Sequence, residues 1–412
     1  MKKLRRFAQL SFAIAAMLVF SNSTYAFSRK PIPAVPAATP SANTAFAGLS
    51  PSNAAALDLA LRTAAQEAGL VSMSAAIATG GELRWAGSFG WADIESAALA
   101  SPSTRYRTGS VAKPITATAM MRLVDRGQLE LDTPLGTSIV GLPEEARRIT
   151  PRQLAAHVSG IRHYSFTEIL SKSVGLNGPK HYDSVAEGLD GFIGDRLKFA
   201  PGTKFLYSTW GYSLLSRKLE LAAGAPFPQL LQTLVFDPCA MQDTAVDSIA
   251  PMKARASFYQ ADGGRYSPAD PVDSSNRIAG GGLVSTPSDL VRLAICAEKD
   301  SFLSPAARKT MWTPVPLADG QANEQNYALG WRIDTSVRMF GKDKPTAIIH
   351  HGGQQEGGAS FLVIAPALHV AVAVMTNSGT DAARAAVQDT AYALVRALNG
   401  IDSAGPVAVP PK

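Results

Sequence analysis

The sequence contains few of the residues and patterns that mark metal-binding and redox proteins. Only 2 of its 412 residues are cysteine, and it has neither a Cys-x-x-Cys pair nor a His-Glu-x-x-His motif. No ligand set for a structural or catalytic zinc is therefore visible, and we expect neither a metal nor another cofactor. Cys239 and Cys296 are 57 positions apart, which is compatible with one disulfide or with two buried thiols.

The apolar run near the start of the sequence is too short for a membrane span. It extends from Phe7 to Phe20, 14 residues, whereas a transmembrane helix needs about 20. Four basic residues precede it and small residues follow it up to Ala26, which is the pattern of a cleaved export signal over residues 1–26. We therefore expect a periplasmic or secreted protein with no integral membrane segment after cleavage. An uncleaved anchor is the alternative.

The charge of the chain is nearly balanced once this segment is set aside. The formal net charge is +6, and four of these positive charges lie before Ala26, which leaves +2 for the rest. No basic stripe with interleaved aromatic residues is present, so we expect no nucleic-acid partner. The expected partner is a small-molecule or peptide substrate, and the oligomeric state is left open.

The pattern of apolar residues predicts one composite α+β unit between a flexible leader and a disordered tail. Residues 27–48 form the leader, residues 49–399 the folded unit and residues 400–412 the tail. Strands and helices near both ends enclose a mostly helical middle, so we expect two lobes with a cleft between them. The expected elements are helices at 52–69 and 381–398, strands at 71–78, 82–91, 359–365 and 370–376, and a mostly helical region at 110–318.

The segment Ser110-Val-Ala-Lys113 places a hydroxyl and an amine three residues apart where a helix is expected to begin. Residues i and i+3 share a helix face, with Cβ atoms about 5–6 Å apart, so Lys113 can reach the Ser110 oxygen. A neutral lysine at this place can act as the base for a serine nucleophile. Pro114 fits the first turn of this helix and Gly127 its end. The alternative is a capping serine beside a solvated lysine.

Three further segments carry residues of chemical interest. Tyr207 follows a Pro-Gly turn and precedes a helical run, and a buried phenol can relay protons. The segment His350-His351-Gly352-Gly353 precedes a strand, and its glycines permit close approach of the backbone to a ligand. The segment from His157 to Tyr164 is expected to be a packed turn whose histidines have hydrogen-bond partners.

Taken together, four motifs resemble the serine β-lactamase and penicillin-binding protein superfamily in its class C-related branch, and most of all the mitochondrial β-lactamase-like serine proteases and their bacterial relatives. The resemblance covers most of residues 49–399. It implies a β-lactamase/transpeptidase-like α+β fold, with an antiparallel sheet flanked by terminal helices and a mostly helical lobe. The motifs are Arg107-Thr-Gly-Ser-Val-Ala-Lys113, His157-Val-Ser-Gly-Ile-Arg-His-Tyr164, Tyr207-Ser-Thr-Trp-Gly-Tyr212 and Gly280-Gly-Gly-Leu-Val-Ser-Thr286.

The resemblance also implies roles for individual residues. Ser110 takes the place of the acylated nucleophile, Lys113 that of its base and Tyr207 that of the proton relay to the leaving group. Backbone N–H groups of Ser110 and Gln354 take the place of the oxyanion hole. This second donor assumes that His351-Gly352-Gly353 stands where the family has Lys-Thr-Gly, which makes His351 and Gly353 substrate-binding residues. A shift of one residue puts His350 in that position instead.

Two departures from the family pattern bear on the substrate. Thr209 stands two residues after the relay tyrosine, where the β-lactamases and carboxypeptidases usually have an asparagine that donates to a substrate amide. His351 replaces their lysine, so that a titratable group is expected to meet a substrate carboxylate. Both changes favour an ester, amide or peptide substrate. The alternatives are a D-alanyl-D-alanine carboxypeptidase or weak β-lactamase, and a non-catalytic peptide or peptidoglycan binder.

A Ser-His-Asp hydrolase is the nearest rival among enzymes. It is disfavoured because the sequence has no Gly-x-Ser-x-Gly elbow.

Overall fold

The structure is a computed structural model that describes residues 29–36, 44–45, 48–136, 138–165, 168 and 180–403. The predicted export signal and the residues after 403 lie outside this part of the chain. Within the part described, no helix is long and apolar enough to cross a membrane. The fold is α+β, as expected.

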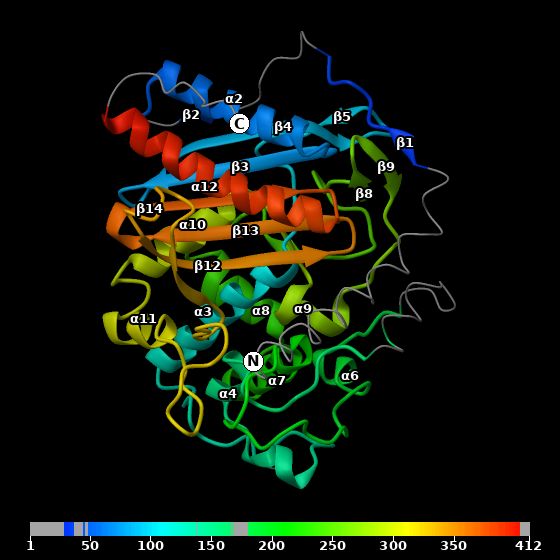
Figure 1. The fold of residues 1–412 in the computed structure, drawn as a ribbon. Helices are drawn as coiled ribbons and strands as arrows, with labels where there is room; N and C mark the ends of the chain where they lie inside the picture. The colour runs from blue at the N-terminus through cyan, green and yellow to red at the C-terminus, as the bar shows by residue number, and fades with distance from the viewer. Residues whose placement is uncertain are drawn as a thin grey trace, which may run out of the picture.

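An eight-stranded antiparallel sheet joins the two ends of the folded unit (Figure 1). Its order is β11-β12-β13-β14-β3-β4-β2, with β5 paired to β4. The strands β14 and β3 lie far apart in the sequence and pair directly, with Val374 opposite Ala75. The bounds are β2 Thr44–Ala45, β3 Ser72–Thr79, β4 Glu82–Asp93, β5 Ala98–Leu99, β11 Arg332–Ser336, β12 Thr346–Gln355, β13 Gly358–Ala365 and β14 Val370–Thr376.

Two terminal helices cover one face of this sheet, as Figure 1 shows. They are α2 (Pro51–Glu67) and α12 (Asp381–Ser403). Leu57 and Leu61, one helical turn apart on α2, are fully buried with Val387 of α12 and Val374 of β14. Residues four apart share a helix face while alternate strand residues share a sheet face, so the apolar pattern of the sequence specifies this layer.

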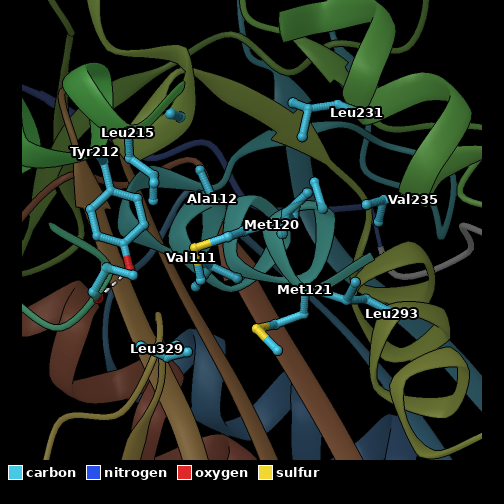
Figure 2. Packing of buried hydrophobic residues seen from close by; sticks show 14 of the residues in the cluster. Val111, Ala112, Met120, Met121, Tyr212, Leu215, Leu231, Val235, Leu293 and Leu329 are labelled. Carbon is cyan, nitrogen blue, oxygen red and sulfur yellow. Dashed lines mark hydrogen bonds between the residues drawn. The ribbon is translucent and has the colours of Figure 1, made fainter. Parts of the chain in front are cut away.

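A helical lobe packs on the other face of the sheet, around α3 (Ala112–Asp125). Figure 2 shows Met120 and Met121 of α3 among Leu231, Val235 and Leu293, which come from three other segments. Burial on all sides explains why α3 carries almost no polar surface. The other helices of the lobe are α4 Pro151–Ala155, α6 Val185–Gly188, α7 Thr209–Ala223, α8 Phe227–Leu231, α9 Ile278–Gly281, α10 Pro287–Glu298 and α11 Pro305–Met311.

Short helical turns complete the lobe. They are η1 Gly109–Val111, η2 Glu144–Arg148, the π-helical turn η3 Gln232–Phe236, η4 Ser275–Arg277 and, beyond the lobe, η5 Pro366–Leu368. Cys239, just after η3, forms a disulfide with Cys296 of α10. This settles the choice between a disulfide and two thiols that the sequence left open.

The main elements agree with the sequence prediction, and three details do not. The region 110–318 is not helical throughout, because it contributes short strands to two small three-stranded sheets. The leader contributes β1, where Lys30 pairs with Tyr266, and the edge strand β2. Helix α12 continues to Ser403, into the predicted tail. The strands of the small sheets are β1 Lys30–Pro31, β6 Tyr106–Arg107, β7 Ala245–Val246, β8 Tyr259–Asp262, β9 Arg265–Pro268 and β10 Leu283–Ser285.

Candidate active site

Ser110 lies in the turn η1 that leads into α3, at the junction of the sheet and the helical lobe. The preceding Gly109 has φ +47°, and a Cβ on it would lie 2.6 Å from the backbone nitrogen of Gln354. Only glycine permits this close approach of β12 to the turn. The expected helix start is confirmed, with Pro114 in the first turn of α3 and a positive φ at Gly127 after its end. Ser110 is partly exposed, so a substrate can reach it.

Lys113 is fully buried one turn further along α3. Its Nζ lies 3.1 Å from Ser110 Oγ, 2.6 Å from the carbonyl oxygen of Gly280 and 3.4 Å from Thr209 Oγ1. Burial lowers the pKa of Lys113 well below its usual value, and the charge of Arg332 lowers it further. None of these three partners is a carboxylate, so no anion among them opposes this shift.

Tyr207 brings a phenol to the same serine. It precedes Ser208, whose Oγ accepts a hydrogen bond from the N–H of Gly211 at 2.9 Å and so caps α7. The phenol hydrogen-bonds to Ser110, and burial raises the pKa of Tyr207 above its usual range. The Tyr207 ring centre is 4.7 Å from Lys113 Nζ. Ser110, Lys113 and Tyr207 therefore form one contiguous cluster.

Two histidines hold the segment that carries Tyr207. His157 is buried with φ +61°, and its Nδ1 accepts a hydrogen bond from the N–H of Ser208 at 3.1 Å. His163 Nδ1 accepts from the N–H of Thr209 at 3.3 Å. Burial lowers both pKa values, that of His163 to about 4. The packed turn expected from the sequence therefore also holds the backbone of the segment that carries Tyr207. His157 Nε2 has no hydrogen-bond partner among the described residues.

The backbone of β12 passes directly beside the nucleophile. A Cβ on Gly353 would lie 2.0 Å from the carbonyl oxygen of Thr108 and 3.0 Å from the nitrogen of Ser110. The absence of a side chain at Gly353 is thus a condition for this arrangement. The same stretch brings the backbone nitrogen of Gln354 next to Gly109, while the Gln354 side chain is exposed. The backbones of the two expected oxyanion-hole residues are therefore close together.

The two adjacent histidines of β12 point to opposite faces of the sheet. His351 Nε2 lies 2.8 Å from the hydroxyl of Tyr327, and the His351 ring centre is 6.4 Å from that of Tyr207. His350 Nε2 lies 2.6 Å from Asp334, and its ring packs beside Phe361 on the face that α12 covers. Of the two, His351 is the one on the side of Ser110.

The environment of His351 differs from the one expected of a cation that titrates beside a substrate carboxylate. The side chain is 1% exposed, and its Nδ1 donates to the carbonyl oxygen of Gly352 at 2.7 Å. When the ring is neutral, Nε2 accepts the hydrogen bond from the Tyr327 hydroxyl. Burial and the charge of Arg332 lower the pKa of His351 well below its usual value. Both ring nitrogens are thus occupied within the protein.

Thr209, which stands where the family's asparagine donates to the substrate, packs against the lysine. Its side chain is 4% exposed, and its Oγ1 lies 3.4 Å from Lys113 Nζ. Gly280 explains this packing, because a Cβ there would come 2.6 Å from Thr209 Cγ2. The three consecutive glycines that begin at Gly280 belong to one of the four motifs of the sequence. Three residues without side chains in a row were the sign, in the sequence, that the backbone lies close to the site here.

Sequence reasoning missed Arg332, the first residue of β11. Its charge acts on the pKa of Lys113, Tyr207 and His351. No local pattern identified it, because only the pairing of β11 with β12 brings this distant residue near the site. Among the described residues, no group of three or more histidine, cysteine or acidic side chains could hold a metal ion.

A cavity of about 630 Å³ adjoins the site. His163 and Tyr164 separate it from Tyr207 and Thr209, to which they are linked by ring and hydrogen-bond contacts. Its walls are apolar over much of their surface and carry basic residues at the edge. The lining includes Arg162, Lys198, Phe199, Lys204, Phe205 and Leu206.

Comparison with known proteins gives one consistent result. The family model described as Beta-lactamase matches residues 57–397. The human protein "Serine beta-lactamase-like protein LACTB, mitochondrial" is 25% identical, over 73% of this chain and 70% of that protein. "Esterase EstB" of Burkholderia gladioli is 32% identical, over 52% of this chain and 57% of the esterase.

The fold is likewise that of solved structures in this group. The D-amino acid amidase from Ochrobactrum anthropi, in a complex with L-phenylalanine, superposes with a TM-score of 0.71. The match covers 85% of this chain and 99% of the amidase at 21% sequence identity. At this identity the likeness shows the fold alone.

Proposed function

The chain belongs to the beta-lactamase family, and from this premise we propose that it cleaves ester, amide or peptide bonds through an acyl-enzyme formed on Ser110. Its family and relatives make it a serine hydrolase. The observation that carries the assignment of the site is the distance of 3.1 Å between Lys113 Nζ and Ser110 Oγ, with the lysine fully buried.

Lys113 is arranged to act as the base. A neutral amine has two hydrogens and one lone pair. The Gly280 carbonyl oxygen and Thr209 Oγ1 can accept both hydrogens, which leaves the lone pair for the Ser110 hydroxyl. As Ser110 Oγ bonds to the substrate carbonyl carbon, its proton passes to Lys113.

Tyr207 completes the proton path. With its pKa raised by burial, the phenol is protonated at neutral pH and can give its proton to the leaving group as the scissile bond breaks. The proton held by Lys113 then restores the phenol, so the path is balanced. Water afterwards attacks the acyl-enzyme, releases the acid product and regenerates the Ser110 hydroxyl.

The backbone N–H groups of Ser110 and Gln354 are the proposed oxyanion hole. Such donors stabilise the tetrahedral intermediate by about 2.7–4 kcal/mol each in comparable sites. The close approach of β12 to η1 at Gly353 and Gly109 supports this proposal.

The contacts of Thr209 and His351 support an ester, amide or peptide substrate. Thr209 is bonded to Lys113 and His351 is neutral, so the site lacks both the amide donor and the lysine charge that β-lactamases and carboxypeptidases use at these positions. One relative is named an esterase and a structural neighbour an amidase. Activity on a D-alanyl-D-alanine peptide or a β-lactam is the alternative.

The test is labelling and turnover with purified protein. We expect a fluorophosphonate to add once, at Ser110, and we expect no labelling of Ser110→Ala, while the exposed-site control Ser103→Ala labels like wild type. A panel of p-nitrophenyl ester, aminoacyl anilide, D-alanyl-D-alanine peptide and nitrocefin then identifies the bond that is cleaved. An adduct on another serine would contradict the assignment, and an unlabelled protein would favour the non-catalytic binder.

We also propose that the protein is exported, on the basis of the signal pattern in residues 1–26. N-terminal sequencing of the protein from a periplasmic fraction should begin near Phe27. Recovery of the uncut chain only in membranes would instead indicate an anchor.

A further inference from the structure

Arg107 is a buried cation in the same motif as Ser110, three residues before it. We propose that Arg107 is a positioning residue of the oxyanion hole. It clamps the β12–β13 hairpin to the segment that carries the nucleophile, and so fixes the N–H of Gln354 relative to the N–H of Ser110. The inference rests on the proposed function, because the oxyanion hole is part of that proposal.

The guanidinium of Arg107 joins two segments that are far apart in the sequence. Its Nε donates to Asp247 Oδ2 at 2.8 Å, and its Nη1 donates to the main-chain carbonyl oxygen of Glu356 at 2.6 Å. The side chains of Arg107 and Asp247 are 3% and 0% exposed. The rigid fork of a guanidinium can make both bonds at once, and its charge makes each of them stronger than a bond from a neutral donor.

The partners of Arg107 are themselves held in place. Asp247 Oδ1 accepts a hydrogen bond from Arg255 at 2.7 Å, and the Asp247 N–H donates to the carbonyl oxygen of Gly282 at 2.9 Å. The guanidinium carbon of Arg107 lies 4.1 Å from the ring centre of Phe258. The base of the clamp is therefore bonded to the body of the protein.

Glu356 lies in the two-residue turn between β12 and β13, two residues after Gln354. The other residue of this turn, Gly357, has φ +69°, and a Cβ on it would lie 2.5 Å from Phe258 Cβ. The turn is thus pressed against the same side chain that packs on Arg107. Holding the Glu356 carbonyl therefore restricts the end of β12 that carries the Gln354 N–H.

Ser360 makes a second connection between the hairpin and the nucleophile segment. It is fully buried on β13, and its Oγ donates to the carbonyl oxygen of Thr108 at 2.6 Å. In the strand register Ser360 lies opposite Gly353, the residue before Gln354. Since the bond from Arg107 lies at the turn, the hairpin is attached to the nucleophile segment on both sides of Gln354.

The catalytic value of an oxyanion hole depends on where its donors lie. An N–H group is effective when it is about 2.7–3.1 Å from the developing oxyanion, and a misplacement of about 1 Å can cost about 100-fold in rate. A buried ion pair, in contrast, contributes little net stability compared with apolar residues of similar volume. The geometry that it imposes on the hairpin is therefore the better explanation of the pair between Arg107 and Asp247.

The experiment compares p-nitrophenyl benzoate with p-nitrophenyl thionobenzoate, in which sulfur replaces the carbonyl oxygen. The two compounds share the leaving group and the phenyl group, and both need the nucleophile and its base. Sulfur forms a longer bond to carbon and is a weak hydrogen-bond acceptor, so the thionoester gains little from an oxyanion hole. For each compound kcat/KM is divided by the rate of hydroxide hydrolysis. The quotient of the two corrected values, oxygen ester over thionoester, is the oxyanion ratio.

We expect an oxyanion ratio of about 100 or more for wild type. Arg107→Lys keeps a charge for Asp247 but has no fork to bond Glu356 at the same time, and it should lower the ratio about tenfold or more. The matched control is Arg255→Lys. Arg255 also binds Asp247, and among the described residues none of its side-chain hydrogen bonds goes to the β12–β13 hairpin, so this variant should leave the ratio unchanged.

The oxyanion ratio separates positioning from a merely structural role. A loss of folded protein, or of the base, lowers both rates equally and leaves the ratio as it is. If Arg107→Lys does not fold, Ser360→Ala decides, because it removes one bond of the same attachment and should lower the ratio about threefold or more. A wild-type ratio near one overturns the inference. An unchanged ratio in the deciding variant, or an equal fall in Arg255→Lys, overturns it as well.

Labelling of Ser110 distinguishes failure of the inference from failure of the proposed function. If Ser110 is labelled but neither ester is cleaved, the ratio is taken from the labelling rates of a fluorophosphonate and its P=S analogue, with the same expected results. If Ser110 is labelled and the ratio does not respond to the deciding variant, the proposed function stands and the inference is wrong. If Ser110 is neither labelled nor required for ester cleavage, both are wrong.

Discussion

Replacement of Lys113 by methionine tests the proposed chemistry and the charge state of the lysine at the same time. Methionine has a similar length and no polar group, so it can fill the buried space that the Lys113 side chain occupies. Without the amine, no base lies beside Ser110. General-base catalysis contributes about 10²–10⁴-fold, and we expect fluorophosphonate acylation of Lys113→Met to fall by at least the lower figure.

The difference in stability between wild type and this variant depends on pH, because the pKa of Lys113 is lowered in the folded protein. The unfolded lysine, with a pKa near 10.4, binds a proton that the folded lysine has released. Between the two pKa values, wild-type stability therefore rises with pH by about 1.4 kcal/mol for each pH unit, and it falls as the pH drops toward the folded pKa. Lys113→Met has no such dependence from this position.

Urea unfolding of both proteins at pH 8 and pH 9 measures the effect. The free energy of unfolding of wild type relative to Lys113→Met should increase by about 1.4 kcal/mol between these two values. The loss of the hydrogen bond to Gly280 shifts the whole difference but does not change its slope. A difference that is constant with pH would mean that Lys113 stays protonated in the folded protein, and the base assignment would then be wrong.

Three further predictions address the relay, His351 and the disulfide. Tyr207→Phe should slow the cleavage of anilides about 100-fold or more, and that of p-nitrophenyl esters less than tenfold, because p-nitrophenolate leaves without a proton. Equal losses in the two kcat/KM values would argue against a proton relay. We compare kcat/KM for a carboxylate-bearing substrate with kcat/KM for its neutral analogue. Since His351 is neutral and buried, the ratio of the two should not fall between pH 6 and 8. A fall in the ratio would support a titrating role for His351. Replacing Cys239 and Cys296 together by alanine should lower the free energy of unfolding by about 4 kcal/mol, the value that the chain-entropy model gives for a loop of 57 residues. An unchanged urea midpoint would contradict this prediction.

The parts of the fold that the sequence predicted have strong local patterns. The strand 370–376 was predicted with the bounds that β14 has, because it is a continuous apolar run between turn residues. The strands predicted at 71–78 and 82–91 are β3 and β4, which pair with each other across the glycines at 80 and 81. Ser110 and Lys113 were found for the same reason, since η1 leads directly into α3 and local backbone geometry brings the two side chains together.

The parts that could not be predicted depend on pairings between distant segments. The strands β8 and β9 are four residues each, too short to show a period. The contacts of Thr209 and His351 could not be predicted either, because they are set by Gly280 and Tyr327, which come from other segments. Sequence alone thus supplied the residue types and not their charge states.

The distribution of charge is where the site departs most from the expectation. Relatives carry the charge that faces the substrate on a lysine of the strand beside the nucleophile. From the sequence we expected the titratable His351 to take the place of this lysine. In the structure the rings of His351 and His157 are neutral, Lys113 has its pKa lowered toward the neutral form, and the fixed positive charge belongs to Arg332 on the neighbouring strand. The charge of Arg332 disfavours a proton on Lys113. Burial of Lys113 and a cation on the strand paired with β12 thus act in the same direction, because both favour the neutral amine that a general base requires.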